Sequence, residues 1–249
     1  MSGHSKWASI KRKKATTDAK RGAIFTRVIK EITVAARLGG GDPDANPRLR
    51  MAIAQGKAAN MPQANVERAI KKGTGDLPGV RYEAITYEGY GPGGAAILIE
   101  ALTDNKRRTV ADIRHLMTKY GGNLGESGSV AWQFENRGSL TIPAEGVAED
   151  ELFDLAVEHG AEDIERDEEQ FVILVPAEKA VQLQNVLEQR HFTVSAMEVG
   201  LEPINTVEIS GADARLLLKL LSALDDNEDI EKVSSNCDIL EADLAGFSA

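Results

Sequence analysis

Several residue types and patterns are scarce in this 249-residue chain, and each scarcity excludes a class of protein. The single cysteine, Cys237, has no partner for an internal disulfide, which is typical of a reducing compartment. No run approaches the roughly 18 apolar residues that a membrane-spanning helix needs. The basic first residues are followed by no apolar stretch, so no secretory signal is predicted. We therefore expect a cytoplasmic protein with no membrane contact.

Catalytic and metal-binding patterns are also missing from the sequence. The four histidines are scattered, and none stands in a metal-binding spacing such as HxxxH or CxxC. The stretch 89–94 matches GxGxxG, but an expected strand follows it, which favours a hairpin turn over a dinucleotide-binding loop. Carboxylates are abundant, yet no pair is singled out as acid and base. The sequence predicts a non-enzymatic protein with no cofactor, no metal and no small-molecule substrate.

Positive charge is scarce beyond residue 79. Residues 1–79 carry 16 lysines and arginines against 6 aspartates and glutamates, a net charge of +10. Residues 80–249 carry a net charge of −20. This division predicts a basic module that binds a polyanion, while the acidic remainder is repelled and points away. The alternative interpretation is a solvated basic face on an acidic, soluble protein.

Three short amphipathic helices are predicted in the basic module. The first spans about 18–38, with apolar residues at helical spacing, and glycines 39–41 end it. Asn46 is the expected N-cap of the second helix, which starts at Pro47 and runs to about Ala59. The third opens at Pro62. The expected inward residues of the second and third helices are Leu49, Ile53 and Ala54, and Val66, Ala69 and Ile70.

The candidate nucleic-acid contacts are cations of this module, with one aromatic residue and two arginines further along the chain. They are Lys6, Trp7, Lys11, Arg12, Lys13, Lys14, Lys20, Arg21, Arg27, Arg68, Lys71, Lys72, Arg107 and Arg108. Phosphate-backbone contact is favoured over base readout, because the third helix offers only commonplace polar residues for reading bases. Residues 1–17 have no apolar periodicity and are expected to form a basic arm. Trp7 either stacks on a base or anchors this arm on the bundle, and anchoring is favoured because aromatics make up only 5% of the chain.

Arg107 and Arg108 stand where an expected helix at 109–120 opens, and there the helix dipole prefers negative charge. They therefore either extend the phosphate-binding surface or contact acidic neighbours. Both interpretations remain open at this point.

The rest of the chain is predicted to be α+β, after a turn-rich linker at 74–79. Strands at 82–87 and 95–102, the helix at 109–120 and a strand at 129–135 give an open ββαβ unit. Residues 137–205 read as βαββαβ, the ferredoxin-like pattern. A strand, helix and strand follow and are expected to return to the open unit. The predicted domains are 1–79, then 80–136 plus 206–240, with 137–205 inserted as the ferredoxin-like domain.

Several long motifs stand in a fixed order along the chain. They are GHSKW (3–7), DAKRG (18–22), LGGGDPDANPRLR (38–50), YEGYGPGG (87–94), TDNKRRTVADIRH (103–115) and GGNLGESGSVAWQF (121–134). With these motifs the chain resembles the YebC/PmpR family, which includes the mitochondrial translational activator of cytochrome c oxidase. The resemblance covers nearly the whole chain and implies a basic three-helix domain followed by two α+β domains.

The resemblance also implies a function of one of two kinds. One is a cytoplasmic, DNA-binding transcriptional regulator that acts through backbone contacts of its basic domain. The other is a ribosome-associated translation factor that binds ribosomal RNA and relieves stalling. Charge does not separate the two, because both polymers present phosphate. The acidic domains are expected either to bind a protein partner or only to orient the basic module.

Overall fold

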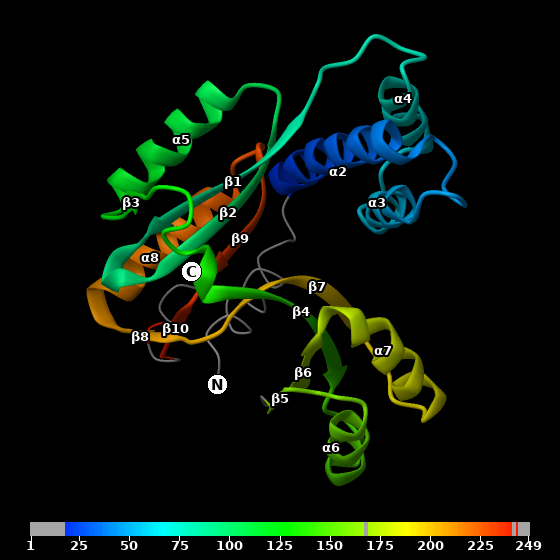
Figure 1. Cartoon of the computed structure of the whole chain (residues 1–249), viewed down its shortest axis with the longest axis vertical. Coiled ribbons are helices and arrows are strands. Elements are labelled where there is room, and N and C mark those ends of the chain that lie inside the picture. The colour runs from blue at the N-terminus through cyan, green and yellow to red at the C-terminus, as the bar shows by residue number, and fades with distance from the viewer. Residues whose placement is uncertain (1–17, 167–168, 241–242, 244–249) are drawn as a thin grey trace.

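The computed structural model describes residues 18–166, 169–240 and 243 (Figure 1). The chain opens with a bundle of three helices, α2 (Asp18–Gly39), α3 (Pro47–Ala58) and α4 (Gln63–Thr74). Apolar residues at helical spacing on all three helices meet in one core, in which Ile32 and Leu49 are fully buried. The three predicted helices of the basic module are confirmed.

The start of α3 follows the local chemistry of its sequence. The side-chain oxygen of Asn46 accepts a hydrogen bond from the Leu49 amide at 3.1 Å, and a proline holds the first helical position. The expectation that Ala54 faces inward is wrong, because Ala54 is exposed. Ala52 and Gly56 are buried instead, since they stand three and seven residues after Leu49 on the same helical face.

The second unit is an antiparallel sheet with two helices on one face. Its strands in spatial order are β3 (Asn123–Leu124), β1 (Glu83–Tyr90), β2 (Ala96–Thr103) and β9 (Ile230–Ser235). Helices α5 (Lys106–Lys119) and α8 (Gly211–Asp225) cover the face that carries Ile97 and Ile99 (Figure 1). A short 3-10 turn at Pro92–Gly94 joins β1 to β2, so the hairpin interpretation of the glycine-rich motif is confirmed.

The expected strand at 129–135 is wrong. Residues Ala131–Gln133 form a 3-10 turn, and the next strand, β4, begins only at Phe134. Val130 and Phe134 pack against Ala96 and Leu98 on the second face of the β1–β2 sheet. The segment is apolar because it packs on the face of a sheet. A short segment that covers a sheet has the same apolar pattern in its sequence as a short strand, so the pattern did not separate the two.

The third unit is a second four-stranded antiparallel sheet with order β5-β6-β4-β7. Its elements along the chain are β4 (Phe134–Pro143), α6 (Glu149–Glu158), β5 (Asp163–Arg166), β6 (Gln170–Pro176), α7 (Ala180–Gln189) and β7 (Ala196–Pro203). Both helices pack into one core with the sheet, around Leu140, Phe171 and Leu183. The βαββαβ sequence of elements is thus observed.

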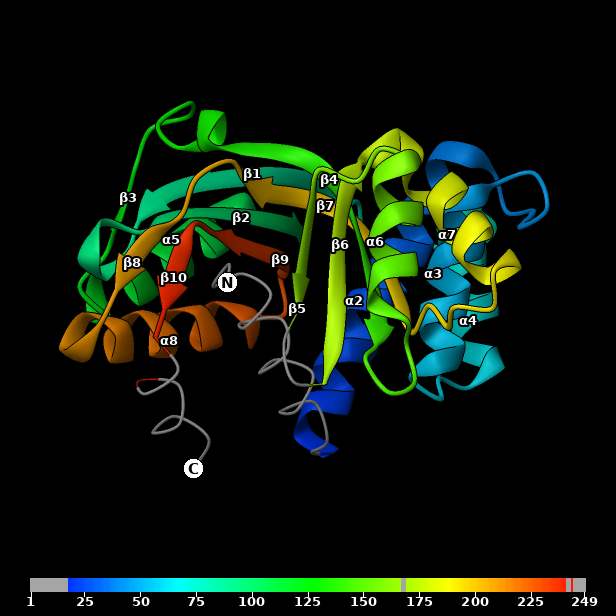
Figure 2. The ribbon, with the colours of Figure 1, turned by 90° about the horizontal axis from the view of Figure 1, so that it is seen from below.

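A small parallel pair lies beside the second unit. Strand β8 (Val207–Ile209) pairs with β10 (Cys237–Ile239), and the thiol of Cys237 is buried in the core formed by α5 and α8. Figure 2 shows this pair and α8 on one side of the molecule, away from α3, α4, α6 and α7. In Figure 1 the helical bundle and the third unit lie at the right, and the second unit lies at the left.

Candidate nucleic-acid interface

A basic face on α4 arises from its helical spacing. Val66, Ala69 and Gly73 point into the bundle, so residues between them are left on the outside. Arg68, Lys71 and Lys72 lie three and four residues apart on that outer side. Within the described part of the chain, no side-chain hydrogen bond or ion pair is found for any of the three.

A close backbone approach fixes α4 against α2. A Cβ atom added at Gly73 would lie 2.4 Å from the Thr33 carbonyl oxygen and 2.7 Å from the Ala36 Cβ. The hydroxyl of Thr33 donates to the Ile29 carbonyl of its own helix at 2.8 Å and also lies 3.4 Å from the Ala69 carbonyl oxygen of α4. The outer face of α4 is therefore held in a fixed orientation relative to α2.

Helix α2 carries cations of a different kind, which hold the bundle against the second unit. The Lys30 ammonium donates to an Asp229 carboxylate oxygen at 2.6 Å and to the Glu228 carbonyl at 3.0 Å. Arg27 donates from Nη2 to the Asn227 carbonyl at 3.2 Å, and its Nη1 lies 3.8 Å from an Asp225 carboxylate oxygen. The structure thus places Arg27, a sequence-predicted nucleic-acid contact, in an interdomain contact.

Asp229 is the centre of this contact. Its side chain is 6% exposed, and it accepts hydrogen bonds from Arg108 Nη2 and from the Thr109 hydroxyl, each at 2.8 Å. Burial raises the pKa of the carboxyl, but the hydrogen bonds from Lys30, Arg108 and Thr109 outweigh this effect and lower the pKa to about 2. A permanent carboxylate therefore joins α2 to the first turn of α5.

The three cations that open α5 differ in their partners. Lys106 forms an ion pair with Glu83 at 2.6 Å, and Arg108 bonds Asp104 as well as Asp229. Arg107 is exposed, and no partner for its side chain is found among the described residues. Two of the three cations thus contact acidic neighbours, which offsets the unfavourable helix dipole, and Arg107 is left to solvent.

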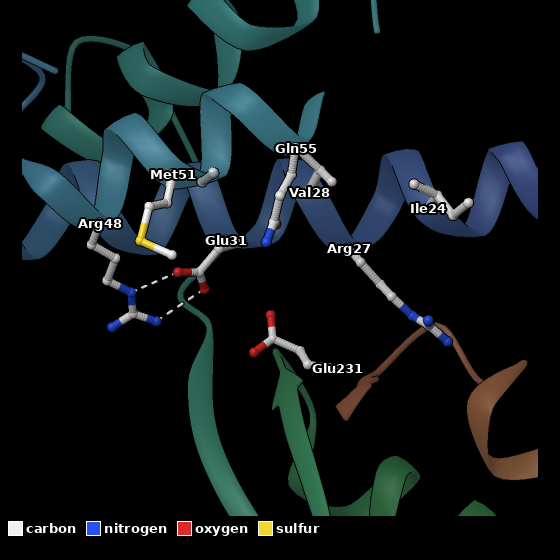
Figure 3. Close-up of a pocket in the computed structure, with 9 residues that line it drawn as sticks. Ile24, Arg27, Val28, Glu31, Arg48, Met51, Gln55 and Glu231 are labelled. Carbon is white, nitrogen blue, oxygen red and sulfur yellow. Dashed lines mark hydrogen bonds and ion pairs between the residues drawn. The ribbon is translucent and has the colours of Figure 1, made fainter. Parts of the chain in front are cut away.

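A cleft of about 680 Å³ opens between α2, α3 and β9 (Figure 3). On its wall Arg48 forms a two-pronged ion pair with Glu31, with distances of 2.6 and 2.9 Å to the two carboxylate oxygens. Glu231 points toward this pair from β9, as Figure 3 shows. Burial and the nearby charge of Glu31 raise the pKa of Glu231 to about 7. Arg27 and Arg48, the two cations in the lining of this cleft, are both already bonded within the protein, so neither is free for a phosphate.

The remaining predicted contacts belong to the arm before α2. Lys6, Trp7, Lys11, Arg12, Lys13 and Lys14 lie outside the described residues. Lys20 and Arg21 fall in the first turns of α2, but their side chains also lie outside what the structure describes. Of the fourteen predicted contacts, the structure brings together Arg68, Lys71 and Lys72 on one face and leaves Arg107 on another.

Sequence reasoning did not single out Lys57 or Arg114 as contacts. Lys57 is exposed near the end of α3, and Arg114 is exposed on α5 two turns after Arg107. Helical spacing carried the signal for Arg114, because it lies seven residues after Arg107 and outside the buried positions. Asp229 was also missed, since an isolated aspartate in an acidic segment gives no local sign of its partners.

Two features of the described residues bear on other functions. No helix among them is long and apolar enough to cross a membrane. Within the same residues, no group of three or more histidine, cysteine, aspartate or glutamate side chains has the geometry to hold a metal ion.

Comparison with known proteins matches almost the whole chain to one family. Residues 5–76 match the model of the TACO1/YebC protein N-terminal domain, and residues 82–237 match that of the TACO1/YebC second and third domain. A curated relative from Chlorobaculum parvum, named "Probable transcriptional regulatory protein", is 52% identical over 99% of both chains. A relative with the same description from Sulfurihydrogenibium sp. is 52% identical over 98% of both.

A solved structure gives the same result at the level of the fold. The crystal structure of a conserved hypothetical protein from Aquifex aeolicus superposes with a TM-score of 0.79 at 46% sequence identity. The match covers 92% of this chain and 94% of the Aquifex chain. Two of its curated relatives, from Chlorobaculum parvum and Sulfurihydrogenibium sp., are named as probable transcriptional regulatory proteins. Through both its sequence and its fold, this chain belongs to the TACO1/YebC family.

Proposed function

We propose that this protein is a non-enzymatic transcriptional regulator that binds DNA through phosphate contacts of its basic N-terminal domain, residues 1–79. The observation that carries the proposal is the outer face of α4, where Arg68, Lys71 and Lys72 have no partner among the described residues. The three cations outnumber Glu67, the one carboxylate of α4, and a polyanion would neutralise the excess positive charge. The net charge of +10 in this domain supports the same conclusion.

Contacts to the phosphate backbone fit α4 better than contacts to base edges. A recognition helix reads bases with residues near its N-terminus. On α4, Arg68 is the sixth of 12 residues and Lys71 and Lys72 lie in the last turn, which leaves Gln63 and Asn65 at the start of the helix as candidates for base contacts. The protein is therefore expected to bind many sequences with similar affinity.

The acidic remainder gives the bound protein an orientation. We propose the domain layout 1–79, then 80–136 with 206–240, and 137–205 as an insertion, with most of the acidic surface of the two later domains directed away from the nucleic acid. Their net charge of −20 is repelled by phosphate. Orientation of this kind leaves the acidic domains accessible to a protein partner.

Ribosomal RNA is the alternative target. The same cations suit an RNA backbone, and the weak base-reading potential of α4 fits recognition of a folded RNA by shape. In this second proposal the protein is a translation factor that binds the ribosome and relieves stalling.

Salt dependence of binding tests the shared proposal. If about six side chains contact duplex phosphates, the slope of log affinity against log salt is roughly −5, at about 0.9 per contact. Replacing Arg68, Lys71 and Lys72 by glutamine should make the slope less steep by roughly 2.7, in fluorescence anisotropy with duplexes of different sequence. Replacing Lys11, Arg12, Lys13 and Lys14 by alanine should likewise weaken binding to every sequence alike.

A control for the α4 variant removes the same charge elsewhere. Arg190, Arg215 and Lys219 are exposed cations on the acidic units, and the triple glutamine variant of these three should bind as the unchanged protein does. Equal slopes for all three proteins would contradict the assignment of α4. Crosslinking in cells with sequencing of the bound nucleic acid separates the two targets, because promoter DNA supports the first and ribosomal RNA the second.

A further inference from the structure

Helix α5 is a basic element within an otherwise acidic part of the chain. Its 14 residues include five lysines and arginines and a single acidic residue, Asp112. The buried positions Thr109, Ile113 and Met117 define its inner face. The opposite side of the helix faces solvent (Figure 1).

One flank of this solvent side has no carboxylate. Arg107, Ala111, Arg114 and Thr118 follow one another at spacings of four, three and four residues, so they form a single row along the helix. All four are exposed. Asp112 lies on the other flank with Arg108, whose guanidinium is already bonded to Asp104 and Asp229.

The two arginines of this row are free to bind a ligand. No hydrogen bond or ion pair of Arg107 or Arg114 is found in the part of the chain that the structure describes. They are seven residues apart, which places their Cα atoms about 10 Å apart along the helix axis. Only the small side chains of Ala111 and Thr118 share the row, so a backbone can approach the helix closely. Guanidinium groups also match phosphate oxygens in a two-pronged geometry.

The Asp229 contact fixes this row relative to the N-terminal domain. The same carboxylate bonds Lys30 of α2 and Arg108 of α5, at 2.6 and 2.8 Å. Arg107 is the residue before Arg108, so the row begins next to the point where α2 is held. In Figure 1, α5 and α4 both lie along the upper margin of the molecule.

We propose that the Arg107–Arg114 row of α5 is a second phosphate-binding surface, which contacts the backbone of the same nucleic acid that the N-terminal domain binds. This inference rests on the proposed function and extends it to a domain whose net charge is negative. Asp229 holds the two surfaces in one fixed arrangement, so both engage a rigid duplex without a loss of conformational freedom on binding.

The test is a salt titration of the full-length double variant Arg107→Gln/Arg114→Gln, with duplex DNA and duplex RNA as probes. Loss of two phosphate contacts should make the log–log slope less steep by roughly 1.8 on duplex DNA, and should change it in the same direction on duplex RNA. The matched control is Arg215→Gln/Lys219→Gln, which removes two exposed cations from α8 and should keep the slope of the unchanged protein. Arg107→Lys/Arg114→Lys retains the charge and should restore most of the slope.

The outcomes separate this inference from the proposal beneath it. If the unchanged protein binds with a steep slope and the Arg107→Gln/Arg114→Gln variant has the same slope, the α5 surface is refuted and the N-terminal surface stands. If the Arg107→Lys/Arg114→Lys variant keeps the shallow slope of the glutamine variant, a charge-based contact is also refuted. If the unchanged protein binds neither duplex, the proposed function fails, and this inference fails with it.

Discussion

At the scale of single residues, Asp229 determines what the cations around it can do. Lys30 and Arg27 lie on a helix that the sequence marks as basic, yet their partners lie about 200 residues further along the chain. A buried ion pair costs free energy when one partner is removed, because the remaining charge is left in a poor solvent. These two cations therefore stabilise the arrangement of domains, whereas Arg68, Lys71 and Lys72 remain available for a ligand.

We expect Asp229→Asn to lower the free energy of unfolding by about 3 to 5 kcal/mol near neutral pH, because Lys30 loses its buried counter-charge. Urea denaturation measures this loss. Asp112→Asn, which changes an exposed aspartate on α5, should change the stability by less than about 0.5 kcal/mol. Equal stabilities for the two variants would show that the Asp229 contact does not stabilise the fold.

The pKa of Asp229 also predicts a pH dependence. The folded state lowers this pKa from 3.8 to about 2, so between these values the unfolded chain binds more protons at this site than the folded chain does. Acidification from about pH 4 to pH 2 should therefore remove stability that is fully present at higher pH. The difference in stability between the unchanged protein and Asp229→Asn should shrink over that window in urea titrations. A constant difference down to pH 2 would contradict the assigned pKa.

At the scale of elements, local patterns predicted the helices well and the sheet partners poorly. Helical spacing and the Asn46 cap placed α2, α3 and α4 within a few residues of their observed ends. The apolar stretch at 129–135 was misassigned as a strand, because a segment that packs on the face of a sheet has the same apolar pattern as a strand of that sheet. The pairing of β3 with β1 involves only two residues of β3, too few for any periodicity.

The contact between α2 and α4 gives a prediction at this scale. Gly73→Ala should destabilise the protein by about 1 to 3 kcal/mol, because the added methyl group meets the Thr33 carbonyl and must push the helices apart. Alanine is otherwise the better helix former by about 1 kcal/mol, so the sign of the change identifies the cause. Thermal denaturation measures it, and Ala54→Gly at an exposed site in α3 gives the propensity effect alone. A more stable Gly73→Ala protein would mean that the two helices do not pack this closely.

The sequence predicted which cations belong to the candidate site, but not which of them stay available for a ligand and which bond to the second unit. Charge counts located the basic domain, and helical spacing placed Arg68, Lys71 and Lys72 together. The sequence could not separate these from Arg27 and Arg108, because charge alone does not reveal the Asp229 carboxylate or the Asn227 carbonyl, which folding brings from 121 and 200 residues away. Helical spacing could also have identified Arg114, because this residue lies seven positions after Arg107 on the same side of the helix.

At the scale of the whole molecule, the third unit has its own core and its own closed set of sheet pairs. Strands β4 to β7 pair only with one another in the described residues, and Leu140, Phe171 and Leu183 lie in a core without side chains from the second unit. Domains with a separate core generally fold by themselves.

The proposed insertion 137–205, lengthened to residue 134 so that it contains the whole of β4, should therefore be folded in isolation, with dispersed amide signals in NMR spectra and a cooperative thermal transition. The fragment 80–136 lacks β9 and should not give such a spectrum, because it would leave an edge of β2 and the inner face of α5 uncovered. An unfolded 134–205 fragment would contradict the proposed insertion.

The burial of Cys237 has a practical consequence for all of these experiments. It is the only cysteine of the chain, and burial raises the pKa of its thiol, so the reactive thiolate is suppressed in the folded protein. Labelling by a thiol reagent must therefore wait for the strands around β10 to separate. The rate of that labelling therefore reports how often the second unit opens locally, and the measurement needs no engineered cysteine.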